Sequence, residues 1–63
     1  MSAMTSTTTM IRRLEGMLGT KDLSEWEQGF VETLVERLEA GQVTQLTERQ
    51  VEILERLHGK HFA

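Results

Sequence analysis

The chain has 63 residues, a formal net charge of −3 and no cysteine. A chain of this length forms at most one domain with a thin core, and without cysteine neither disulfides nor thiolate zinc sites can reinforce that core. No stretch approaches the roughly 20 apolar residues of a membrane span, and the N-terminus lacks the features of a signal peptide, so we expect a cytoplasmic protein without a membrane partner.

The acidic residues gather in the later part of the chain. Residues 1–22 carry three Lys/Arg against two Asp/Glu, whereas residues 23–63 carry four Lys/Arg against eight Glu. Acidic surfaces repel phosphate, and duplex-binding domains gain affinity from clustered Lys and Arg. This distribution therefore disfavours nucleic acid as the main partner.

The N-terminal segment divides at Met10. Residues 1–9 are rich in Ser and Thr and contain only Met and Ala as apolar residues, so we predict a disordered tail there and a single small helical domain over residues 10–63. From Met10 to Leu18 apolar residues recur at helical spacing, and Gly19 stands where a C′ glycine ends a helix. Such a short helix is unstable alone, and the sequence leaves open whether it packs on its own chain or on another.

Two capping boxes predict the starts of two longer helices. Residues 24–27 read Ser-Glu-Trp-Glu and residues 47–50 read Thr-Glu-Arg-Gln, so that each hydroxyl accepts from the N3 amide while the N3 side chain reaches back to the cap residue. We predict one helix over residues 25–40, ended by Gly41, and another that continues to about His58, with Gly59 as its C′ residue. The connection is short enough to fold the second helix back. The predicted fold is all-α: an antiparallel helix-loop-helix hairpin with a short N-terminal helix.

The first long helix carries a wide apolar stripe opposite a row of Glu residues, and its apolar members are Trp26, Phe30, Val31, Leu34, Val35 and Leu38. A lone Trp is more often core than a binding anchor, although Trp supplies much contact area at small entropic cost. Gly29 costs about 1 kcal/mol relative to Ala within a helix. Either it is neutral, or a neighbouring helix approaches closely beside it.

Chemistry-bearing groups are sparse. Small helical hairpins offer little concavity for converging polar groups, so we expect no enzyme, no catalytic residue and no cofactor. His58 and His61 would share one face only if the helix extended past Gly59, and two imidazoles do not complete a zinc site. A histidine placed favourably at the negative end of the helix dipole is the preferred interpretation, and we expect no metal.

Residues 23–61 also carry a wider pattern, Ser-x-Trp-Glu-x-x-Phe followed by Leu-Thr-x-x-Gln-x-x-Ile-Leu. It resembles a short helical module of bacterial and phage proteins, often one segment of a larger DNA-processing polypeptide. The resemblance implies a phage or prophage setting linked to nucleic-acid metabolism and implies no active site.

These observations favour a small non-enzymatic protein-interaction module that acts on a host or phage nucleic-acid-processing protein, or that forms a homo-oligomer. The residues expected to bind the partner are an apolar centre, where its members are not fully internal, and an acidic rim: Trp26, Phe30, Glu32, Glu36, Val51, Glu52, Leu54 and Glu55. The alternative is a nucleic-acid-binding accessory protein, which would use the basic residues Arg12, Arg13, Lys21, Arg49 and Arg56.

Overall fold

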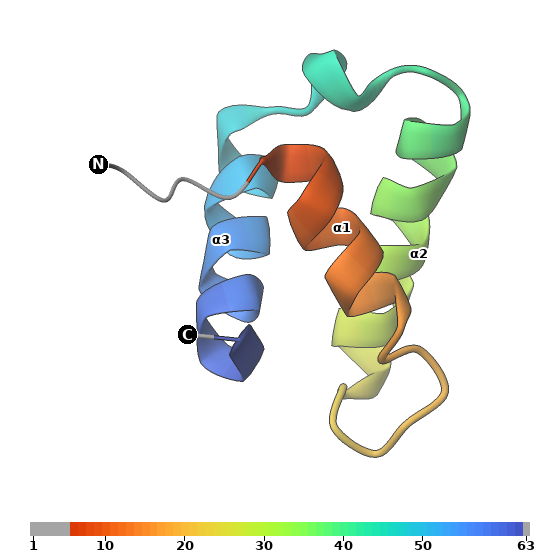
Figure 1. Cartoon of the computed structure of the whole chain (residues 1–63), viewed down its shortest axis with the longest axis vertical. Helices are drawn as coiled ribbons and strands as arrows, with labels where there is room; N and C mark the ends of the chain where they lie inside the picture. Colours follow the sequence, from red (N-terminus) through yellow and green to blue (C-terminus); the bar gives the residue numbers. More distant parts are fainter. Residues whose placement is uncertain (1–5, 63) are drawn as a thin grey trace.

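A computed structural model describes residues 6–62 of the chain (Figure 1). Its elements in chain order are α1 (Thr7–Glu15), α2 (Glu25–Glu39), the short 3₁₀ helix η1 (Val43–Gln45) and α3 (Glu48–Phe62). Within this described part the regular elements are all helical. The all-α class predicted from the sequence is therefore confirmed.

Helix α1 lies between α2 and α3 and packs against both (Figure 1). The two longer helices run antiparallel, as predicted, but their backbones approach each other at few points. The predicted hairpin is thus right in direction and incomplete in packing, because α1 fills the space between its two legs. The N-terminal helix packs on its own chain.

The core is built from apolar residues of all three α-helices. Helix α1 supplies Met10, Ile11 and Leu14, and the loop after it supplies Leu23; the remaining buried residues are Val31 and Leu34 of α2 and Leu54 and Leu57 of α3. Burial of each such side chain contributes about 1.5–3 kcal/mol. This burial explains how a helix too short to be stable alone is held in place.

Both capping boxes form as the sequence predicts. The Ser24 Oγ accepts from the Glu27 amide at 3.1 Å, and the Glu27 carboxylate accepts from the Ser24 amide at 2.8 Å. The Thr47 Oγ1 accepts from the Gln50 amide at 3.1 Å, and the Gln50 side chain accepts from the Thr47 amide at 2.9 Å. Backbone amides that a helix start leaves unpaired are satisfied in both places.

Helix α1 starts and ends earlier than expected. Ser6 is its N-cap, with Oγ accepting from the Thr9 amide at 3.1 Å, so residues 7–9 of the predicted tail are helical. The tail prediction for residues 1–5 lies outside the described residues. After Glu15 the backbone continues in hydrogen-bonded turns to Gly19, whose φ of +82° is the left-handed conformation expected of a C′ glycine.

The end of α3 differs from the prediction. The helix passes through Gly59 and runs to Phe62, so the assignment of Gly59 as C′ is wrong. Side chains in the added turn find partners: the Phe62 ring stacks on His58 with centroids 5.2 Å apart, and the Lys60 Nζ lies 3.5 Å from the Glu27 Oε2. Gly41, with φ of +73°, follows the C-cap Ala40 of α2, in the position predicted for a glycine that ends the helix.

Candidate binding surface on helix α2

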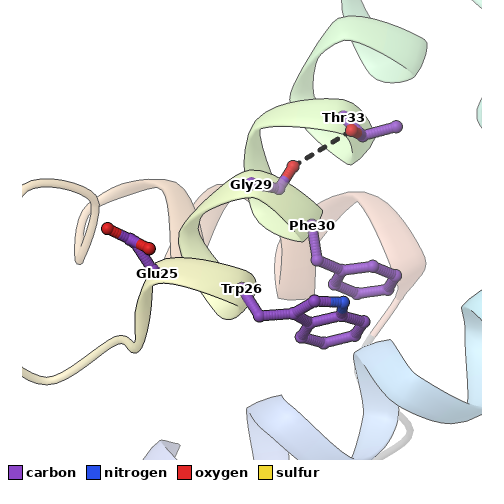
Figure 2. A pocket seen from close by; sticks show the side chains of 5 residues that line it. All are labelled: Glu25, Trp26, Gly29, Phe30 and Thr33. Carbon is purple, nitrogen blue, oxygen red and sulfur yellow. Dashed lines mark hydrogen bonds between the residues drawn. The ribbon is translucent and has the colours of Figure 1, made fainter.

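Trp26 is the most exposed large apolar residue among the described residues, with 61% of its surface accessible. Its indole stacks on the Phe30 ring one helical turn later, with centroids 5.3 Å apart and planes 8° apart (Figure 2). Phe30 is half-buried and packs against the core. The preferred core interpretation of Trp26 is therefore wrong, and Phe30 holds the exposed indole against the body of the protein.

A shallow hollow of about 350 Å³ lies beside this stacked pair. We call it the Trp26 hollow; its lining residues are Glu25, Trp26, Gly29, Phe30 and Thr33 (Figure 2).

Gly29 leaves the floor of the Trp26 hollow open. A Cβ placed on Gly29 would meet nothing within 4 Å, so within residues 6–62 no neighbouring helix makes the close approach that was one interpretation of this glycine. The Thr33 hydroxyl donates to the Gly29 carbonyl at 3.0 Å, which turns it back onto the helix (Figure 2). Three of the lining residues, Glu25, Gly29 and Thr33, are not among the partner-binding residues predicted from the sequence, although their spacing of four places them on one face of the predicted helix.

One carboxylate borders the hollow, and others follow along the same helix. Glu25 belongs to its lining, and Glu32 and Glu36 are exposed on the next turns. The spacing from Glu25 through Gly29 to Glu32 and Glu36 places all four residues on one face of the helix. The single cation of α2, Arg37, donates to the Gln42 side chain at 3.3 Å. The hollow therefore combines an aromatic wall with an acidic border.

The predicted partner-binding residues of α3 do not line this hollow. Leu54 is expected to contribute only if it is not fully internal; it has no accessible surface and belongs to the core, so it is not available to a partner in this structure. Val51 is half-buried, and Glu52 and Glu55 are exposed. The predicted binding residues of α2 and α3 are therefore not combined in the one hollow.

Glu27 serves the fold rather than the hollow. It bridges the first turn of α2 and the last turn of α3 through Lys60. The hydrogen bond from the Ser24 backbone amide lowers the pKa of the Glu27 carboxyl, burial opposes this shift, and the nearby Lys60 charge adds to the lowering. The carboxylate is thus held ionised by the capping box that starts α2.

The basic residues of the alternative function stand on separate elements. On α1, Arg12 forms an ion pair with Glu15 at 2.9 Å, and the Arg13 Nη1 lies 3.1 Å from the His58 Nε2. Lys21 lies in the loop before α2, and Arg49 and Arg56 are exposed on α3. Two of the five are therefore engaged within the chain, and none lines the Trp26 hollow.

The two histidines share α3, since the helix does extend past Gly59. Because an arginine can only donate, the His58 Nε2 is the acceptor in its contact with Arg13, while the Nε2 of His61 is buried without a hydrogen-bond partner in residues 6–62. The described part of the chain contains no group of three or more His, Cys, Asp or Glu that could hold a metal ion.

No protein-family model, curated protein or solved structure matches the chain. The resemblance of residues 23–61 to a phage-associated module thus stays a prediction. Over the described range, none of the helices is both long and apolar enough to cross a membrane.

Proposed function

We propose that this chain is a non-enzymatic interaction module that binds a protein partner through the Trp26 hollow. The observation that supports the proposal is the 61% exposure of its single Trp. Trp is among the residues that contribute most to binding when an interface buries them. Stacking on Phe30 already restricts the indole, so less conformational entropy is lost when a partner covers it.

A different protein fits this surface better than a second copy of the chain. Helix α2 carries five Glu against one Arg. A two-fold dimer brings the same patch of both subunits together, and here that contact would place the two rows of Glu side by side. Like charges in contact are unfavourable. A homo-oligomer through this face is thereby disfavoured.

Nucleic acid is the weaker candidate for the same hollow. An exposed Trp can stack on a base, but such platforms work together with a positively charged groove that tracks the backbone. The charged residue in the lining here is Glu25, and Arg12 and Arg13 already have partners within the chain. The resemblance of residues 23–61 favours a partner protein that itself processes nucleic acid, in a phage or prophage, with this chain as a small regulatory protein.

A peptide-display selection tests the proposal. The whole chain is immobilised and screened against a random peptide library, in parallel with the Trp26→Ala variant. We expect peptides that bind the wild-type chain and not the variant. Peptides retained equally by both, or no enriched peptide at all, would refute the proposed function.

Two controls accompany the selection. Thermal unfolding of Trp26→Ala measured by circular dichroism should match the wild type closely, since an exposed side chain contributes little to the core. Sedimentation of the wild-type chain over a range of concentrations tests self-association. If the wild-type chain dimerises and Trp26→Ala does not, the partner that binds the hollow is a second copy of the chain rather than a different protein.

A further inference from the structure

We infer that the Trp26 hollow receives an arginine side chain from a basic segment of the partner protein. This inference rests on the proposed function and adds the chemistry of the partner. It is carried by three features of the hollow: an aromatic wall with open ring surface, a carboxylate border without a competing cation, and a floor without a side chain.

The aromatic wall suits a flat cation. Phe30 covers one face of the indole at a centroid distance of 5.3 Å, and Trp26 nevertheless keeps 61% of its surface accessible. Among the described residues Phe30 is the one ring stacked on the indole, so no second ring covers its opposite face. A guanidinium stacks on aromatic rings and is more weakly hydrated than an ammonium, and Trp is the best ring for such a contact.

The acidic border selects the charge of the occupant. Glu25 lines the hollow, and among the described residues it enters neither of the two ion pairs, which join Arg12 to Glu15 and Lys60 to Glu27. An incoming guanidinium would therefore meet a carboxylate without displacing a cation of this chain. Arginine binds carboxylates through two parallel hydrogen bonds. Glu32 and Glu36, exposed on the next turns, extend the negative potential along the same helix face.

The open surface over Gly29 gives a partner side chain access to both the aromatic rings and the acidic border. A Cβ on Gly29 would meet nothing within 4 Å, so the aliphatic part of an arginine can lie across the helix between the stacked rings on one side of the ribbon and the Glu25 carboxylate on the other (Figure 2). Long cationic side chains commonly bury their stems on apolar surface in this way while the charged end reaches a polar site. The hollow, at about 350 Å³, has room for such a side chain.

The test uses the peptides from the display selection as probes. Peptides that depend on Trp26 should contain arginine more often than the starting library. In the tightest of them, replacing arginine by citrulline keeps the planar shape and removes the charge. We expect the affinity, measured through the fluorescence of Trp26, to fall at least about tenfold. Lysine in the same position should restore only part of it, because an ammonium lacks the planar fork.

Matched variants of the chain locate the contact. Gly29→Leu should abolish binding by filling the floor, although leucine favours the helix more than glycine does. Gly59→Leu makes the same substitution at another open helical glycine and should bind as the wild type does. Glu25→Gln should weaken the arginine peptide and leave its citrulline version unchanged.

The outcomes separate the two proposals. If Trp26-dependent peptides show no enrichment of arginine, or if citrulline binds as well as arginine, the inference is overturned and the interaction module stands. Equal binding by Gly29→Leu and the wild type would also overturn it. If no peptide depends on Trp26, both proposals fail.

Discussion

The substitution Gly59→Ala tests where α3 ends. In the structure Gly59 lies inside α3, its φ is not positive, and a Cβ there would meet nothing within 4 Å. Alanine is favoured over glycine by about 0.8–1.0 kcal/mol in a helix interior. We therefore expect Gly59→Ala to raise the free energy of unfolding by about 1 kcal/mol, which for a domain of this size raises Tm by about 4–8 °C.

Thermal and urea unfolding monitored by circular dichroism measure this change. Gly41→Ala is the matched control, because its φ of +73° is left-handed and alanine there costs about 1–2 kcal/mol. The two variants should thus shift Tm in opposite directions. A lower Tm for Gly59→Ala would mean that the helix ends at Gly59, as the sequence pattern alone predicts, and would refute the added turn.

Two further predictions concern single side chains. Leu54→Ala truncates a fully buried core residue and should lower the free energy of unfolding by about 2–5 kcal/mol, which is most of the stability of so small a domain. A Tm equal to that of the wild type, measured by circular dichroism, would contradict the burial of Leu54. Because the pKa of Glu27 is lowered by the fold from 4.5, its contribution to stability is present above pH 4.5 and is lost as the pH falls through the lower folded pKa. Urea unfolding at a series of pH values should therefore show a smaller fall in the free energy of unfolding at acid pH for Glu27→Gln than for the wild type. An equal fall in both proteins would exclude this contribution of Glu27.

Local chemistry explains which parts of the fold were predictable. A capping box involves four consecutive residues and its two hydrogen bonds form within one turn, so the starts of α2 and α3 can be predicted directly from the sequence. Glycine at a helix end is less decisive, because its conformation depends on the packing of the residues after it. Gly19 and Gly41 adopt the left-handed conformation, whereas Gly59 stays helical where Phe62 stacks on His58.

The position of α1 was not predictable from local patterns. Its apolar face shows that it must pack on something, but the choice between α2, α3 and another chain depends on contacts distant in sequence. That choice also decides the exposure of the α2 stripe. Val31 and Leu34 are buried, whereas Trp26, on the same periodic stripe, remains exposed. Periodicity thus identified Trp26 and Phe30 of the candidate site, but not Glu25, Gly29 and Thr33, and it could not separate exposed from buried members of the stripe.

The placement of α1 between the two longer helices has a consequence for how the molecule opens. Helices α2 and α3 have few close backbone contacts with each other. Detachment of α1 would therefore remove most of the packing between them and expose the core residues of all three helices at once. No stable two-helix remainder would survive. We therefore expect the domain to open as one cooperative unit, so that the slowest amide protons of α1, α2 and α3 exchange with solvent through the same global opening.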